Sequence, residues 1–493
     1  MKIIEKTTAN TCYIGSETPL ELGEYLLLKN FKNENVLGIV KDIEFKDNIF
    51  INSIKIVGVL KDNKIFINKS PINPNSPALI ASDEILKQIF YIPDGITIGH
   101  LLTRKSIRVA LDTNKLISRH FAILSITGGG KSNTVAVLCK ELAKKNATII
   151  IIDPHGEYAN LSHEELYGKV NVIIPSINPS FLTAEELSVM LGINNEEMKI
   201  YLKYAYDTIK YERKSGHEFI NSLIDLLYSW VQAAEVGWEI KYYNTYKRKY
   251  ERKKVEGKDF QILSSLYNLM NNFLEEFSLF ISDTDIIEQL KPNKINVINL
   301  SGLELHQMLS IVSYISKEIL TKRILYIKSL KDLNCKNERV RELAIKNLET
   351  IRMKYSIVTK PLLLIVEEAH IFIPRDEKTS TSLWLGKIAR EGRKFGIGLG
   401  LVSQRPKQLN PDVLSQTGTK IVLRIVEPED QKYIQKVSED LAEDLTKDLA
   451  SLDIGEALIF GIAVNLPAIV KIDKFDGVYG GKDIDIVGEW RGF

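Results

Sequence analysis

The sequence is poor in cysteine and has no long hydrophobic run. Its three cysteines, Cys12, Cys139 and Cys335, lie far apart among 493 residues, and none belongs to a CxxC pair. This spacing argues against a zinc site and against a disulfide framework. No stretch comes near the roughly 18 uninterrupted apolar residues of a membrane span, and the N-terminus lacks the apolar core of a signal peptide. We therefore expect an intracellular, cytoplasmic protein that makes no membrane contact.

The sequence also has no large excess of positively or negatively charged residues. The 65 Lys plus Arg residues against 63 Asp plus Glu give a net charge of +2, so binding to nucleic acid would need local basic patches. With 44% apolar and 26% charged residues, the composition is that of a globular protein. The length suffices for two or three domains.

The stretch 121–133, FAILSITGGGKSN, predicts a phosphate-binding loop. An apolar strand leads into three glycines, and a lysine and a serine then open a helix, so that backbone N–H groups and a helix N-terminus can hold phosphates. Lys131 would offer a positive charge to the β and γ oxygens of a bound nucleotide, and the Ser132 hydroxyl could bind Mg²⁺. One position departs from the GxxxxGK[ST] pattern, because Ser125 replaces its first glycine. The candidate nucleotide contacts are Thr127, Gly128, Gly129, Gly130, Lys131, Ser132 and Asn133.

Residues 1–95 consist of short apolar segments between Gly, Asn, Asp and Lys clusters, a pattern typical of a small β-barrel or sandwich. This stretch of the sequence has no catalytic cluster, so we interpret it as an assembly or partner-docking domain. Pro93, Gly95 and Gly99 predict a linker over residues 92–102, after which the nucleotide domain begins.

Beyond the linker, apolar strands alternate with helical stretches. Besides the strand at Phe121, the candidates are 147–153, 170–174, 295–300, 362–367, 397–403 and 421–426. This alternation predicts an α/β fold with a mostly parallel, doubly wound sheet. Apolar residues recur every three or four positions over 183–290, which predicts a helical bundle inserted into the sheet.

Within this helical stretch, residues 241–254 (KYYNTYKRKYERKK) hold seven basic residues, four tyrosines and a single acid. Such a segment can track phosphates and stack on bases or on a partner. It can equally be a solvated helix face whose tyrosines pack inward. We favour the helix face and keep the binding surface as an alternative.

Acidic residues follow two of the predicted strands. Glu367 and Glu368 end the run PLLLIVEEAH, where one acid can hold the water shell of Mg²⁺ and the next can polarise the attacking water. We assign Glu367 to the metal and Glu368 to the water. In DPHGEY, Asp153 and Glu157 lie at the same sheet edge. Glu157 is a candidate catalytic acid, whereas Asp153 fits either a supporting acid or an Asx turn with Pro154.

Polar residues also surround the predicted strand 397–403. Gln404 follows it and can contact the γ-phosphate or the attacking water. Arg390 and Arg393 precede this strand, and Arg119 precedes the phosphate-loop strand. Arginines stabilise the charge of phosphoryl transfer and often come from a neighbouring subunit, so each of the three is a candidate finger. Each alone fits a surface salt-bridge residue as well. If one acts in trans, the active form is a ring or a dimer.

Taken in order, SITGGGKSN, DPHGEY, VEEAH, IAREGRKFG and LVSQRP resemble the motifs of HerA, a family of hexameric DNA-translocating ATPases of the FtsK-HerA group. The resemblance covers nearly the whole chain. It implies a RecA-like P-loop ATPase core in two parts, 96–182 and 291–473, with an N-terminal small β-barrel at 1–95 and an inserted helical bundle at 183–290. It further implies a C-terminal tail, 474–493, that packs on the adjacent protomer.

The same resemblance implies partners and roles. ATP and Mg²⁺ are the cofactors, and double-stranded DNA passes through a homo-hexamer that works with a NurA-like nuclease in DNA-end resection and recombinational repair. Glu367 stands where the wider group usually has Asp, and its longer side chain can serve the same metal shell. The implied site residues are Lys131 and Ser132 for phosphate and Mg²⁺, Glu368 as the catalytic acid, Gln404 as the sensor, and Arg119 and Arg393 as inter-subunit arginines.

Two other functions stay open at this point. A conjugation or secretion ATPase of the VirB4 type would move a different polymer. An ATP-gated scaffold would mainly recruit and activate a nuclease, with hydrolysis incidental. ATPase activity that rises with duplex DNA and vanishes in Lys131→Ala would separate the motor from the scaffold.

Overall fold

The computed structural model describes residues 2–4, 7–61, 64–438, 448–480, 486 and 490, and the chain divides into two compact units. The first unit comprises residues 1–171, 292–297 and 360–493, and the second comprises 172–291 and 298–359. The tail predicted to pack on a neighbour, 474–493, lies outside the described residues from 481 onward, except for 486 and 490.

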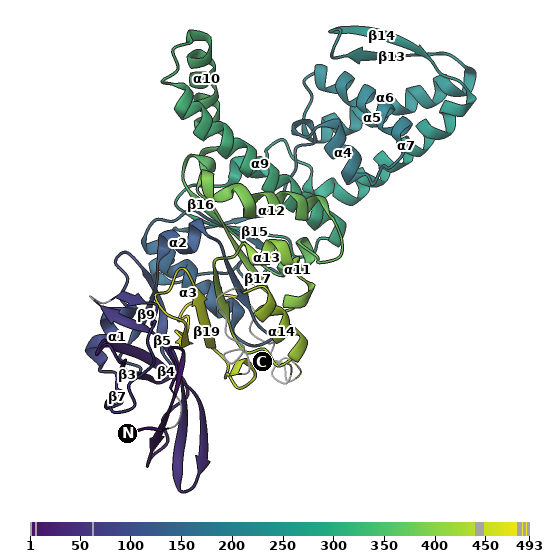
Figure 1. The fold of residues 1–493 in the computed structure, drawn as a ribbon. Helices are drawn as coiled ribbons and strands as arrows, with labels where there is room; N and C mark the ends of the chain where they lie inside the picture. Colours follow the sequence, from purple (N-terminus) through teal and green to yellow (C-terminus); the bar gives the residue numbers. More distant parts are fainter. Residues whose placement is uncertain are drawn as a thin grey trace. The chain divides into compact units, whose positions relative to one another are not determined.

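A seven-stranded antiparallel sheet begins the first unit (Figure 1). Its order is β1-β2-β5-β4-β3-β7, with β6 paired to β5. Burial alternates along β2 and β5, which places Ile14 and Ile54 in a core with Leu26. The pairings of the described residues do not join β1 to β7, so the barrel stays a prediction. The elements are β1 (Lys2–Ile4), β2 (Thr11–Ser16), β3 (Tyr25–Lys29), β4 (Asn35–Lys46), β5 (Ile49–Lys61), β6 (Lys64–Phe66) and β7 (Leu79–Ile80), followed by α1 (Asp83–Phe90).

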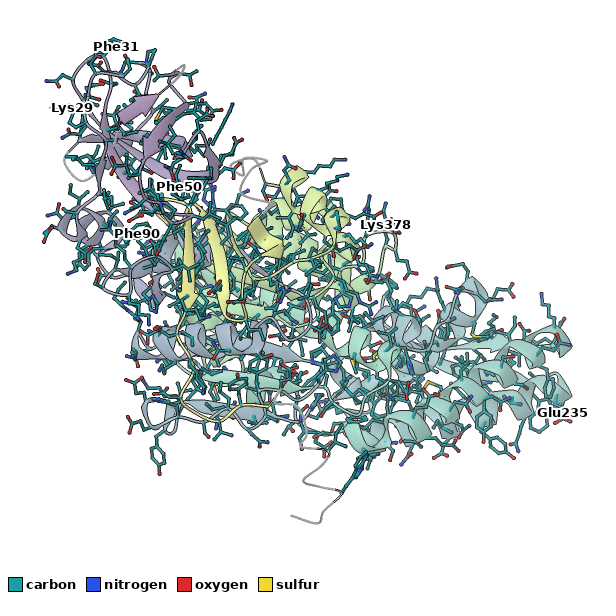
Figure 2. All side chains as sticks on the ribbon, turned by 90° about the horizontal axis from the view of Figure 1, so that it is seen from below. Lys29, Phe31, Phe50, Phe90, Glu235 and Lys378 are labelled. Carbon is teal, nitrogen blue, oxygen red and sulfur yellow. The ribbon has the colours of Figure 1, made fainter. Side chains whose placement is uncertain are left out.

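Two features of this sheet are exposed. The β4–β5 hairpin extends beyond the other strands (Figure 1), and its turn residues Asp47 and Asn48 adopt φ values of 50° and 63°, as a tight hairpin turn requires. At another end of the sheet, Phe31 is 62% exposed and lies near Lys29 (Figure 2). These features leave apolar surface on the N-terminal sheet.

An eleven-stranded sheet positions the nucleotide site. Its order is β12-β15-β11-β16-β17-β10-β18-β19-β20-β8-β9. The strands from β11 to β18 are parallel, and those from β18 to β9 are antiparallel. The strands are β8 (Ile96–Leu101), β9 (Arg108–Leu111), β10 (Phe121–Leu124), β11 (Ile149–Asp153), β12 (Val170–Ile173), β15 (Ile295–Asn299), β16 (Leu362–Val366), β17 (Ile397–Ser403), β18 (Thr419–Val422), β19 (Glu456–Gly461) and β20 (Ala468–Ile472).

The parallel half of this sheet confirms the predicted α/β class. β11 and β16 are buried at every position, as expected for parallel strands that are covered on both faces. The predicted strand at 421–426 instead spans Thr419–Val422. The helices of this unit are α2 (Thr113–Ser118), α3 (Lys131–Lys144), α11 (Ala369–Phe372), α12 (Ser380–Glu391), α13 (Pro411–Ser415) and α14 (Pro428–Lys436).

The linker predicted over residues 92–102 is wrong. Residues Ile96–Leu101 form β8, which lies between β20 and β9 inside the sheet. A Cβ at Gly99 would lie 2.2 Å from the carbonyl oxygen of Lys471. Gly99 therefore lets two strands approach closely, and it does not mark a break in the structure.

The second unit holds helices and one β-hairpin. Leu223, Leu227 and Leu266 are buried, in keeping with their helical spacing. None of the helices in the described part of the chain is long and apolar enough to cross a membrane. The elements are α4 (Ala184–Met190), α5 (Glu196–Tyr211), α6 (Gly216–Val236), β13 (Glu239–Asn244), β14 (Lys249–Lys254), α7 (Gly257–Phe277), α8 (Ile286–Gln289), α9 (Leu305–Asp332) and α10 (Glu338–Lys354).

The interpretation of residues 241–254 as a helix face is also wrong, because they lie in the β13–β14 hairpin. The Asn244 side chain accepts hydrogen bonds from the N–H groups of Tyr246 at 3.1 Å and Lys247 at 3.0 Å, which closes the turn. Ile240 and Tyr242 are buried and alternate with exposed residues, a period of two that belongs to a strand.

Candidate nucleotide site

The phosphate loop joins β10 to α3 at the carboxyl edge of the parallel strands, where ligands bind in α/β sheets. Gly128 and Gly130 adopt φ values of +76° and +103°, which favour glycine. Gly130 immediately precedes α3. The first N–H groups of that helix lack intrahelical acceptors and can bind an anion.

Ser125, which replaces the first glycine of the loop pattern, is fully buried. Its hydroxyl donates to the carbonyl oxygen of Ile126 at 2.8 Å. A Cβ at Gly129 would lie 2.1 Å from Ser125 Oγ. The serine therefore fits because position 129 carries no side chain.

Glu157 and Ser132 meet beside the loop. The Ser132 hydroxyl donates to Glu157 Oε2 at 2.5 Å. The Asp153 carboxylate accepts from the backbone N–H groups of Glu157 at 3.0 Å and Tyr158 at 2.8 Å. These bonds reach four and five residues along the chain, farther than an Asx turn with Pro154 would, and they hold the segment that carries Glu157 beside the loop.

Glu367 directly follows β16 and is buried. The Tyr158 hydroxyl donates a hydrogen bond to its Oε1. Burial raises the pKa of Glu367 well above its usual range, and the charge of Glu157 acts in the same direction. The sequence analysis missed Tyr158, although it belongs to the DPHGEY motif.

Glu368 lies opposite the loop lysine. Its Oε1 is 3.9 Å from Lys131 Nζ, and both side chains are at most 10% exposed. Glu368 adopts φ 45°, a strained value for a non-glycine residue and one that clusters at functional sites. Burial raises the pKa of Glu368, whereas the charge of Lys131 lowers it.

The second carboxylate oxygen of Glu368 is buried next to His370. Among the described residues, Glu368 Oε2 is buried and has no hydrogen-bond partner. His370 Nδ1 lies 3.3 Å away, but burial lowers the pKa of His370 to about 4, so this imidazole is neutral near pH 7. A buried carboxylate oxygen without a partner can accept a proton from water.

Gln404 reaches the loop from the next strand. It follows β17, whose Ser403 pairs with Leu124 of β10. Its Oε1 accepts from the Thr127 hydroxyl at 2.6 Å. The predicted sensor and the predicted phosphate loop are therefore in direct contact.

Asn133 has a structural partner that the sequence did not reveal. Its side-chain amide donates to the Asp473 carbonyl at 2.9 Å, and its oxygen accepts from the Phe475 N–H at 2.8 Å. The Gly455 N–H donates to the Gly129 carbonyl at 3.3 Å. The chain after β18 thus holds the loop, and only the backbone N–H of Asn133 is left for phosphate.

The candidate arginines lie at the opposite edge of the sheet. All three arginines are exposed. Arg119 lies shortly before the first residue of β10, Arg393 lies shortly before the first residue of β17, and Arg390 lies at the end of α12. A strand of seven residues rises about 20 Å, so Arg393 is far from Gln404 of the same chain. The structure therefore does not bring these arginines to their own loop.

His120 connects the elements at the edge of the sheet where the candidate arginines lie. Its Nε2 lies 3.0 Å from the Ala389 carbonyl, and its Nδ1 accepts from the Leu399 N–H at 3.0 Å. Burial lowers the pKa of His120 to about 4, and the positive charges of Arg119 and Arg393 act in the same direction. A neutral His120 thereby joins α12, β17 and the start of β10.

The donors beside the loop fit Mg²⁺. They are the Ser132 hydroxyl and the carboxylates of Glu157 and Glu367. The described residues contain no group of three or more His, Cys, Asp or Glu that could hold a metal ion alone. Magnesium commonly takes one or two carboxylates and completes its shell with water and substrate phosphates, so this donor set suits Mg²⁺ bound together with ATP.

Comparisons with known proteins show the family of this chain. Residues 96–319 match the family described as "Helicase HerA, central domain", and residues 357–473 match "Helicase HerA-like C-terminal". A probable DNA double-strand break repair helicase HerA of Methanocaldococcus jannaschii is 58% identical, covering 100% of this chain and 99% of the relative. The DNA double-strand break repair helicase HerA of Pyrococcus furiosus is 35% identical, covering 99% of this chain and 96% of the relative.

A solved structure shows a more distant likeness. VirB4 of Thermoanaerobacter pseudethanolicus is 16% identical and aligns with a TM-score of 0.49, covering 78% of this chain and 98% of that one. At this score the likeness supports no argument about function.

Proposed function

The chain belongs to the HerA family of DNA double-strand break repair helicases, and from that membership we propose an ATP-driven motor that translocates along double-stranded DNA. The observation that carries the proposal is the buried pair Lys131 and Glu368, 3.9 Å apart beside the phosphate loop. A γ-phosphate would attract Lys131 away from Glu368 and leave the carboxylate as the base for water.

The remaining residues have separable tasks in this proposal. The loop N–H groups and Lys131 orient the phosphates, and Glu368 Oε2 takes the proton of the attacking water. Ser132, Glu157 and Glu367 would hold Mg²⁺, which supplies positive charge to the β and γ oxygens. Gln404 accepts a hydrogen bond from Thr127 at 2.6 Å, and through it the presence or absence of a γ-phosphate at the loop affects the end of β17.

The edge positions of Arg119 and Arg393 support a ring. Because β17 separates Arg393 from Gln404 of its own chain, a role for this arginine in ATP hydrolysis requires the loop of another subunit. We propose a homo-hexamer with duplex DNA in its channel, acting with a NurA-like nuclease in DNA-end resection.

ATP turnover tests the proposal. The purified full-length chain should hydrolyse ATP faster with blunt duplex DNA, and Lys131→Ala should abolish turnover, because the lysine neutralises the transferred phosphate. A mass measurement should show a closed oligomer. A monomer whose ATPase activity ignores DNA would contradict the ring motor, and nuclease recruitment that survives Lys131→Ala without any turnover would favour the scaffold.

A further inference from the structure

The β13–β14 hairpin is a basic element on an acidic segment. Residues 239–254 contain seven basic and two acidic side chains, a net charge of +5. The rest of residues 172–291 contains seven basic and sixteen acidic side chains, a net charge of −9. Positive charge in this segment is therefore concentrated on the hairpin.

Only some of these charges stabilise the hairpin. Lys241 and Arg252 are directly opposite each other across the two strands, and like charges in that position are destabilising. The two acids are already paired, Glu251 with Lys247 at 2.8 Å and Glu239 with Arg252 at 3.7 Å. Folding alone does not explain this concentration of cations.

Four cations remain available for a ligand. Lys241, Arg248, Lys249 and Lys254 are exposed, and the structure records no ion pair for them in the described part of the chain. Lys241 Nζ lies 4.5 Å from the centre of the Tyr250 ring, a contact that leaves its charge exposed. These four cations lie on two paired strands and their turn, and Lys241 and Lys254 share one face of the hairpin by register.

Aromatic packing holds the hairpin in place. Tyr242 stacks on Tyr204, and Tyr243 stacks on Tyr211, each with ring centres 4.0 Å apart. The hairpin lies beside the helices α5 and α6 (Figure 1). At its turn, Tyr246 is 90% exposed. A basic surface with a fixed backbone and an exposed aromatic tip is typical of a nucleic-acid contact.

We propose that the β13–β14 hairpin is a second DNA contact, which binds the phosphate backbone of a duplex through Lys241, Arg248, Lys249 and Lys254. The inference rests on the proposed function as a DNA motor. The acidic surroundings repel phosphate, so the duplex meets this segment only at the hairpin. Because each contact is with phosphate, it adds affinity and no sequence preference.

The test replaces these four residues with glutamine in the full-length chain. We expect the affinity for a labelled blunt duplex, measured by fluorescence anisotropy, to fall at least about tenfold at moderate salt. The magnitude of the slope of log affinity against log salt should decrease by about 3.6, because each of the four phosphate contacts contributes about 0.9. ATPase activity without DNA should be unchanged, since none of the four residues belongs to the set assigned to the nucleotide site.

A matched variant controls for the loss of charge. It replaces Lys32, Lys46, Lys64 and Lys69, which are exposed on the N-terminal region, with glutamine. This control should keep the wild-type affinity and salt slope. Thermal unfolding followed by circular dichroism should be alike in all three proteins, because every replaced side chain is exposed.

Each outcome has one meaning. A hairpin variant with wild-type affinity and salt slope overturns the hairpin contact and leaves the motor intact. A wild-type protein that neither binds duplex nor shows DNA-stimulated ATPase activity contradicts the proposed function itself. If polyglutamate binds the wild type as tightly as the duplex does, the hairpin is a dock for an acidic protein and the DNA assignment is overturned.

Discussion

Burial determines what single residues can do at the nucleotide site. The Glu368 carboxylate is almost fully enclosed, so a neutral side chain of the same size leaves the fold intact but cannot accept a proton. We expect Glu368→Gln to bind ATP and to lower kcat by about 10²–10⁴-fold. Steady-state ATPase assays and equilibrium nucleotide binding measure the two properties.

Glu367→Gln is the matched control for that prediction. It removes a carboxylate from the donor set next to Ser132, so the Mg²⁺ concentration for half-maximal activity should rise. If Glu368→Gln keeps turnover within a few-fold of the wild type, Glu368 is not the base.

The lowered pKa of His120 predicts that the stability of the protein depends on pH. Its pKa in the folded protein is about 4, below the usual 6.5, so the unfolded chain binds a proton first as the pH falls. The stability from a neutral His120 is complete above about pH 6.5 and is lost progressively toward pH 4, by about 3 kcal/mol at most. Urea unfolding at pH 7.5 and pH 5 measures this difference.

A variant isolates the contribution of His120 from that of His370, whose pKa is lowered in the same direction. Asparagine tolerates the φ of 61° at position 120. His120→Asn should be less stable at pH 7.5 by about 1–3 kcal/mol and should lose less stability on going to pH 5. An unchanged pH dependence would show that His120 does not titrate in this range.

At the scale of elements, β8 depends on one glycine. Because a Cβ at position 99 would lie 2.2 Å from the Lys471 carbonyl oxygen, Gly99→Ala should separate β8 from β20 and lower the free energy of unfolding by about 1–3 kcal/mol. Gly257→Ala, at the start of α7 with open space around it, is the control and should be nearly neutral. Equal stabilities of the two variants would show that β8 and β20 separate without cost.

For the whole molecule, the edge positions of the arginines predict complementation between subunits. Lys131→Ala lacks a working loop but keeps its arginines, and Arg393→Ala lacks one candidate finger but keeps its loop. Each should be inactive alone, and mixed assemblies should recover ATPase activity at interfaces that combine an intact loop with an intact arginine. Mixtures of the purified variants, refolded or exchanged together, provide the measurement.

Arg119→Ala and Arg390→Ala extend the same test. Each arginine variant is mixed with Lys131→Ala, which keeps all three arginines. If an arginine variant is inactive alone and recovers ATPase activity in the mixture, the replaced arginine is the one that acts between subunits. If Arg393→Ala alone hydrolyses ATP, or if no mixture recovers ATPase activity, Arg393 does not act on the loop of a neighbouring subunit.

The sequence by itself determined the local chemistry of this protein. The glycine loop with Lys131 and Ser132, the acids after β16 and the glutamine after β17 each depend on a few consecutive residues, so they were predictable. Most buried strands were predictable too, because an apolar run between turns needs no information from distant residues.

Only the tertiary structure decided which of these residues meet. The contact of Lys131 with Glu368 and the support of Glu367 by Tyr158 join strands that are neighbours only after the sheet has formed. The same holds for β8, because Gly99 predicts a break in the sequence and only the folded sheet places it beside Lys471. It holds as well for the basic hairpin, whose tyrosines pack on α5. Such pairings are set by non-local packing, and a local pattern does not contain them.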